Sequence, residues 1–190
     1  MSDVMIDHPD PWIGIPDTFP YDGRWPTARD WATELVAILP EELGEPEPGE
    51  QSALLDYLEV LAESRESRHA SRIYILITGW TSAVYVVDLA IISTAALDGM
   101  SLETFAGADD DSTVEKPLVE PFTTDSGLGG LLCTRFIDSE EFGGLLARAD
   151  YVFPVPGSFV RLYTAQIDLI AFQRLLPQLR ALALTVRVDD

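Results

Sequence analysis

Tyr151-Val-Phe-Pro-Val-Pro-Gly157 opens the stretch of sequence that decides the fold. The apolar runs 150–155 and 158–167 predict two strands, and Pro156-Gly157 between them predicts the tight turn of a hairpin. A helix is expected over 168–184, with Asp168 as its N-cap and Pro177 kinking it near the middle. Its predicted core face consists of Ile170 to Phe172, Leu175, Leu176, Leu179 and Leu182.

The same signals predict the upstream elements. One helix is expected to start after Thr27 and end near Pro40, and a second to run from about Glu50 to Glu66. Runs of β-branched and aromatic residues predict strands over 72–80, 83–94, 114–123 and 128–138, with a helical turn at 102–105 and a linker at 139–148. Strands joined by short turns favour antiparallel pairing. The expected fold class is therefore α+β, an antiparallel sheet of about six strands flanked by two N-terminal helices and one C-terminal helix.

The first 26 residues differ from the rest in composition. They hold five prolines together with Trp12, Phe19, Tyr21 and Trp25. Proline fixes φ and removes a backbone donor, so neither a helix nor a central strand is expected there. We predict a Pro/aromatic-rich arm over 1–26, docked on its own domain or on another chain, and a single α+β domain over 27–190.

The charge balance limits the classes of partner. The 190 residues include 32 acidic and 12 basic side chains, for a net charge of -20. This charge repels nucleic acid and anionic membranes, so neither is expected as a partner, whereas a basic protein is. No apolar run approaches the roughly 20 residues that span a bilayer, and the first residues lack the features of a signal peptide. A cytoplasmic protein is expected, with its one cysteine, Cys133, buried and reduced.

Motifs for chemistry are weak. Asp109-Asp110-Asp111 lacks the alternation of a calcium loop, and the glycines at 127–130 lie between strands rather than before a helix. His8 and His69 with one cysteine give no zinc spacing. We therefore expect no catalytic residue, no metal and no cofactor.

Asp88 is unusual because it interrupts an apolar strand. A buried carboxylate requires a partner or a raised pKa. Asp88 either forms a structural pair with Arg72 or Arg135, or faces outward, or belongs to a pocket of an enzyme or a small-molecule-binding protein.

A resemblance to known proteins is carried by Tyr151-Val-Phe-Pro-Val-Pro-Gly157, Val160-Arg-Leu-Tyr-Thr-Ala165 and the segment from Leu169 to Leu184. These residues, with the Pro/Trp-rich opening at 12–31, resemble a group of small uncharacterised actinobacterial proteins. The layout is similar to the PsbP-like fold of the LpqN-type lipoproteins. The resemblance implies an antiparallel sheet flanked by helices, and binding rather than catalysis.

The expected function is that of a non-enzymatic cytoplasmic protein-binding domain, in the class of an immunity protein or a secretion-associated chaperone for a basic partner. The alternatives are a self-associating component of a larger assembly, as a homo-oligomer, and the small-molecule pocket at Asp88. The candidate partner-binding residues are large aromatics and exposed acids, namely Trp12, Trp25, Trp80, Glu45, Glu47, Asp109, Asp110 and Asp111.

Overall fold

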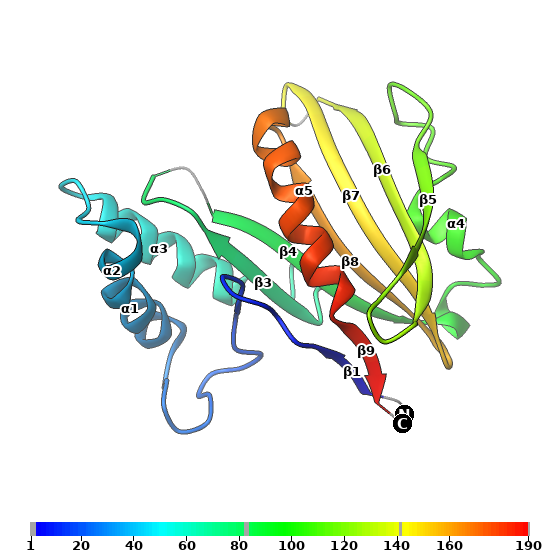
Figure 1. Cartoon of the computed structure of the whole chain (residues 1–190). Helices are drawn as coiled ribbons and strands as arrows, with labels where there is room; N and C mark the ends of the chain where they lie inside the picture. The colour runs from blue at the N-terminus through cyan, green and yellow to red at the C-terminus, as the bar shows by residue number, and fades with distance from the viewer. Residues whose placement is uncertain (1–2, 82–83, 141, 190) are drawn as a thin grey trace. The chain divides into compact units, whose positions relative to one another are not determined.

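The computed structural model describes residues 3–81, 84–140 and 142–189, and it has the predicted α+β class (Figure 1). One antiparallel sheet has seven strands in the order β2-β3-β4-β8-β7-β6-β5, one more than predicted, and β1 and β9 form a separate two-stranded ribbon. The strands are β1 (Asp3–Ile6), β2 (Ile13–Gly14), β3 (Arg72–Ile77), β4 (Val84–Ser93), β5 (Leu118–Thr123), β6 (Gly129–Ser139), β7 (Gly144–Val155), β8 (Ser158–Gln166) and β9 (Val186–Asp189). The helices are α1 (Ala28–Ile38), α2 (Pro40–Leu43), α3 (Glu50–Glu63), the 3-10 helix η1 (Thr94–Ala96), α4 (Leu102–Ala106) and α5 (Leu169–Leu184).

The chain divides into two compact units. One, the sheet–helix unit, is Met1–Asp10 with Val87–Asp190, and the other, the helical unit, is Pro11–Val86. The segment predicted as an arm, 1–26, is shared between the two, because β1 pairs with β9 whereas β2 pairs with β3.

In the helical unit, α1 and α3 pack together and with β3 around a shared apolar core. Helix α1 begins where predicted, because the Thr27 side chain accepts from the Asp30 N–H and the Asp30 carboxylate accepts from the Thr27 N–H. The core includes Trp31, Leu35, Val36, Leu54, Leu58, Ile73 and Ile75, all of them buried.

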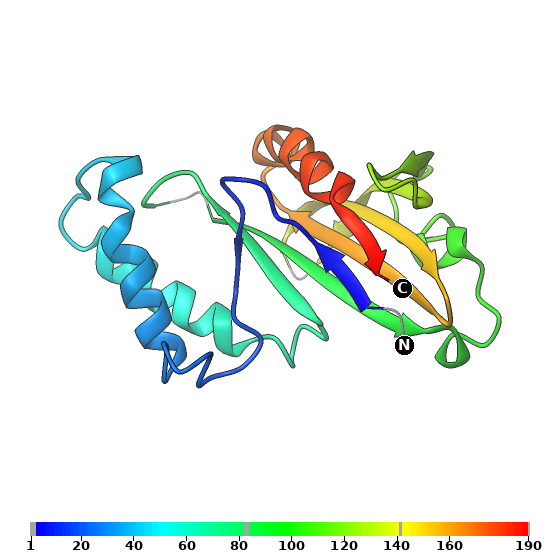
Figure 2. The same ribbon diagram turned by 60° about the horizontal axis from the view of Figure 1, so that its bottom comes forward.

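In the sheet–helix unit, α5 lies against β7 and β8, as Figures 1 and 2 show. Phe172 of α5 meets Phe136 of β6 with ring centroids 6.3 Å apart. The helix continues through Pro177, and its buried residues include Phe172, Leu175, Leu179 and Leu182, as predicted. The prediction that Ile170 belongs to this core face is wrong, since its side chain is 65% exposed.

Strand β7 corrects the predicted linker. It begins at Gly144 rather than near 150, and it pairs with β6 over 144–152 and with β8 over 147–155. Apolar and charged residues alternate only from Ala147 onward, and the two small alanines at 147 and 149 give no strand signal of their own. The part of β7 that was predicted as a linker carries Arg148, which belongs to the candidate site.

Candidate functional site

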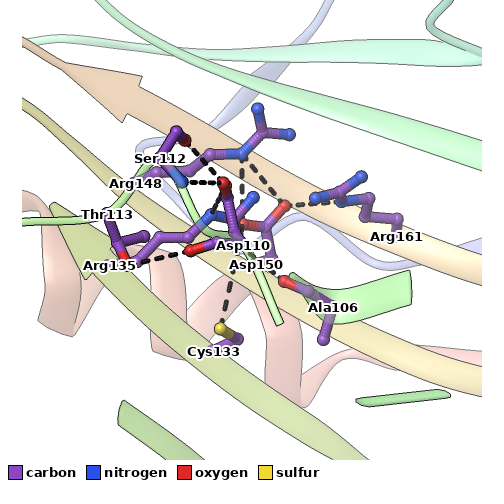
Figure 3. Close-up of polar contacts among 9 residues, drawn as sticks. All are labelled: Ala106, Asp110, Ser112, Thr113, Cys133, Arg135, Arg148, Asp150 and Arg161. Atoms are coloured by element: carbon purple, nitrogen blue, oxygen red, sulfur yellow. Dashed lines mark hydrogen bonds and ion pairs between the residues drawn. The ribbon is translucent and has the colours of Figure 1, made fainter. Parts of the chain in front are cut away.

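A cluster of buried charges lies on one face of the sheet–helix unit, contributed by β6, β7 and β8 (Figure 3). The strand register explains the arrangement. Asp150 of β7 stands opposite Cys133 of β6 and Tyr163 of β8, and Arg148 stands opposite Arg135. Directly paired residues and residues two apart share a face, so these side chains point to the same side of the sheet.

Asp150 is the centre of the cluster. Its side chain is 0% exposed and accepts from three guanidinium groups. Oδ2 receives Arg135 Nη1 at 2.8 Å and Arg148 Nε at 3.1 Å, and Oδ1 receives Arg161 Nε at 2.5 Å. A carboxylate has about four acceptor positions, and these contacts use most of them.

Arg135 connects the cluster to α4. Its Nη1 donates to the backbone oxygen of Ala106, the last residue of that helix, at 2.6 Å. Its Nε lies 3.2 Å from Asp110 Oδ2, within ion-pair distance, but the N–H is not directed at that oxygen. Among the residues that the structure describes, this Nε is the one buried side-chain nitrogen or oxygen without a hydrogen bond. The three arginines and two aspartates leave one surplus positive charge within an acidic protein.

The loop after α4 is shaped to approach Arg135. Gly107 has φ +90, and a Cβ there would lie 2.3 Å from Arg135 Nη1, so a larger residue would displace the guanidinium. In the same loop, Asp110 accepts from the Ser112 hydroxyl at 2.5 Å and from the Ser112 N–H at 3.0 Å. These hydrogen bonds, chiefly that of the Ser112 side chain, and the nearby guanidinium groups lower the pKa of Asp110.

An open hollow of about 410 Å³ lies beside the cluster. Its lining mixes apolar, acidic and basic groups: Leu97, Met100, Thr104, Phe105, Gly107, Asp109, Asp110 and Arg161. Burial lowers the pKa of Arg161, and its guanidinium carbon lies 5.4 Å from the Phe105 ring centroid. A second hollow of about 670 Å³ is lined in part by Glu103, Asp109 and Lys116.

Cys133 is the candidate nucleophile nearest to these charges, and its surroundings suppress its reactivity. The side chain is buried, and burial raises the pKa of the thiol even though Arg135 Nη1 lies 3.7 Å from Sγ. A thiol that stays protonated at neutral pH is a poor nucleophile and a poor metal ligand. The arrangement is suited to holding α4 and its loop on the sheet rather than to covalent chemistry.

The three predicted tryptophan anchors belong to the helical unit. Trp12 is buried, with 3% of its surface exposed. Trp25 is half-buried and donates from Nε1 to Glu34 Oε2 at 2.7 Å, and Trp80 is half-buried and donates to the Gly44 backbone oxygen at 3.0 Å. Their role in partner binding stays a prediction.

The predicted acidic residues fall into two groups. Glu45 and Glu47 are exposed in the connector between α2 and α3, whereas Asp109, Asp110 and Asp111 follow α4 in the sheet–helix unit. Asp109 accepts from the Thr104 hydroxyl at 2.7 Å, and Asp110 belongs to the buried cluster. Among the described residues, no group of three or more His, Cys, Asp or Glu side chains is placed to hold a metal ion.

Asp88 is buried, so it does not face outward, and it stands opposite Tyr163 in the β4–β8 register. The guanidinium of Arg135, one of the two expected partners, binds Asp150 and lies beside Asp110. Neither of the two hollows includes Asp88 in its lining. A small-molecule pocket at this residue stays a prediction.

Asp150, Arg148 and Arg161 were not among the predicted site residues. A signal was present, because Arg148 and Asp150 alternate with the alanines at 147 and 149, and Arg161 stands alone in an apolar strand. The predicted linker over 139–148 included Ala147 and Arg148, so half of this alternating pattern lay outside the predicted strand.

The chain matches no known family of proteins in sequence. No protein-family model matches the chain, and neither does a curated protein sequence. In the described part of the chain, every helix is too short or too polar to span a bilayer. The solved structure of LpqN from Mycobacterium tuberculosis, a protein described as involved in cell envelope biogenesis, is similar at a TM-score of 0.49 and 8% identity, over 100% of this chain and 85% of that one. This likeness assigns neither a family nor a function to the chain, and membership in an actinobacterial group stays a prediction.

Proposed function

We propose that the protein is a non-enzymatic, cytoplasmic protein-binding domain whose partner is basic, in the class of an immunity protein or a secretion-associated chaperone. The observation that carries this proposal is the way the chain uses its few cations. At least seven of the twelve basic side chains form ion pairs with the chain's own acids: Arg24, Arg29, Arg65, Arg135, Arg148, Arg161 and Arg187. Most of the cations are therefore occupied, and the acids outnumber the cations that remain.

The segment 41–50 illustrates this surplus. It includes most of α2, the connector to α3 and the first residue of α3. It carries Glu41, Glu42, Glu45, Glu47 and Glu50, and none of them forms an ion pair with a residue that the structure describes. The connector is fastened at one end by the Trp80 hydrogen bond to Gly44 and at the other by Glu50, which accepts from the Glu47 N–H at 2.7 Å. A fixed row of uncompensated carboxylates accelerates encounter with a cationic protein and selects against acidic ones.

The state of the reactive groups supports binding over catalysis. Asp150 accepts from three guanidinium groups, Arg135 Nη1 donates to Asp150 and to the Ala106 backbone oxygen, and the thiol of Cys133 is buried with a raised pKa. A general acid, base or nucleophile requires access to a substrate, which these groups lack.

The test is affinity purification of the tagged protein from the cells that produce it, with partners identified by mass spectrometry after low-salt and high-salt washes. We expect one basic protein that is lost as salt rises. Neutralising Glu41, Glu42, Glu45 and Glu47 to Gln should weaken its recovery, whereas the matched Glu→Asp variant, which keeps the charge, should not. Recovery of this chain alone, in several copies, would instead favour the self-associating assembly. A partner retained at high salt by all three proteins would refute the electrostatic basis of the proposal.

A further inference from the structure

Exposed apolar side chains gather at one end of the sheet–helix unit. Five of the thirteen large hydrophobic side chains that are exposed in the described residues lie there, and we call them the apolar end: Phe142, Leu145, Ile167, Leu169 and Ile170. Ile167 and Ile170 are the most exposed of the five, at 63% and 65%. Single exposed apolar residues are ordinary, but a contiguous group marks an interaction surface.

The strand register brings the members of the apolar end together. Ser139 pairs with Gly144, so Phe142 lies at the tip of the β6–β7 hairpin and Leu145 just below it. Ala147 pairs with Gln166, so β8 ends beside the start of β7 and Ile167 follows at the same level. Helix α5 then begins at Leu169, and Figure 1 shows its start and the β6–β7 turn at the same end of the unit.

The chain's own packing does not account for these side chains. The stripe of α5 that packs on the sheet starts at Phe172 and continues through Leu175 and Leu179. Ile170 lies outside this stripe, so the packing of α5 on the sheet does not require an apolar side chain at that position. Burial of aliphatic side chains is the main favourable term in association, so binding of a partner over the apolar end would be favourable.

The charges around the apolar end indicate what covers it. Asp138 and Glu140 flank it on the β6 side, both exposed and without an ion pair to a described residue. Asp168 flanks it on the helix side and accepts from the N–H groups of Ile170 at 2.8 Å and Ala171 at 3.1 Å. The nearest cation along α5 is Arg174, one turn beyond Ile170.

We propose that the apolar end binds the apolar face of a basic amphipathic segment of the protein partner, with the flanking carboxylates pairing its Lys or Arg side chains. This inference rests on the proposed function and assigns a surface to it. A second copy of this chain fits poorly, because it would set the same three carboxylates against each other within a dimer of twice the net charge of -20.

The experiment uses two fluorescent peptides of about four helical turns, one with leucine and lysine in amphipathic spacing and one with serine in place of leucine. Binding to the full-length protein is measured by anisotropy at low and near-physiological salt. The test variant is Ile167→Ser/Ile170→Ser. The matched control is Ile38→Ser/Val60→Ser, which removes two exposed aliphatic side chains from α1 and α3.

We expect the leucine peptide to bind the wild type and the control variant alike, and to lose about tenfold or more in affinity for the test variant. Equal affinity for all three proteins, or equal binding of the serine peptide, would overturn the assignment of the surface while leaving the electrostatic proposal intact. If neither peptide binds at low salt, both proposals fail. Light scattering that shows a dimer abolished only in the test variant would identify a second copy as the occupant and would also overturn the inference.

Discussion

Replacing Asp150 with Asn tests whether the charged cluster holds the sheet–helix unit together. The change removes one charge from a side chain that is 0% exposed and keeps its size. Three guanidinium groups, which contact the carboxylate at 2.8, 3.1 and 2.5 Å, then lose its negative charge and one of its two acceptor oxygens. Arg135 is affected most, because it is 4% exposed and only Asp110 remains beside it.

The expected loss follows from the cost of leaving a buried charge uncompensated. Removing one partner of a buried pair costs about 3–5 kcal/mol, a large part of the ~5–15 kcal/mol that stabilises a typical domain. Arg148 and Arg161 are partly exposed and can turn to water, so Arg135 accounts for most of the loss. The double variant Asp150→Asn/Arg135→Met should lose less than the sum of the two single changes, because it removes the stranded cation as well.

The assay is equilibrium unfolding in urea followed by far-UV circular dichroism. Tryptophan fluorescence serves as an internal control, because all four tryptophans (Trp12, Trp25, Trp31 and Trp80) lie in the helical unit. Asp111→Asn, on an exposed side chain, should change stability by less than about 0.5 kcal/mol. If Asp150→Asn costs less than about 1 kcal/mol, the cluster is not the structural centre that its geometry indicates.

Three further predictions concern the neighbourhood of this cluster. Gly107→Ala should destabilise the protein by about 1–3 kcal/mol more than Gly99→Ala, since both have positive φ but only the former places a methyl group against a buried guanidinium; urea unfolding of the two variants measures the difference. Cys133 should not react with Ellman's reagent in the native protein and should react fully in concentrated guanidinium chloride, and fast native labelling would contradict its burial. Ser112→Ala should destabilise the protein at neutral pH, because its hydroxyl stabilises the charged form of Asp110. The pKa of Asp110 in the folded protein is lowered from its usual 3.8. The difference in stability between the wild type and the variant should therefore be present above pH 3.8 and disappear as the pH falls through the lowered pKa. A stability difference that is unchanged at pH 2 would refute the role given to the Ser112 hydroxyl.

Much of the fold was predictable because local signals agree with the tertiary structure. The Thr27 capping box, the Pro156-Gly157 turn and the apolar stripe ending at Leu182 each specify an element by short-range chemistry. The pairing of β1 with β9 was not predictable in this way, because two four-residue segments at opposite ends of the chain carry no local sign of their partner.

The candidate site was predictable only in part. Asp88 and Asp110 attract notice in the sequence, one as an acid in an apolar strand and the other as part of an acidic run. Asp150 follows Ala-Arg-Ala and resembles a loop residue until its strand is extended back to Gly144. Asp150 binds three arginines from three strands because the register of those strands places them side by side. Composition does not reveal strand register.

The central claim is that uncompensated acids on this protein recruit a basic partner. Its most direct test is the association rate constant of the purified protein with the basic partner recovered from its cells, measured by stopped flow over a range of ionic strength. The account predicts a rate that falls steeply with salt, and a lower rate for the variant with Glu41, Glu42, Glu45 and Glu47 changed to Gln that converges on the wild-type rate at high salt. A rate that is independent of salt, or equal for the two proteins at low salt, would contradict it.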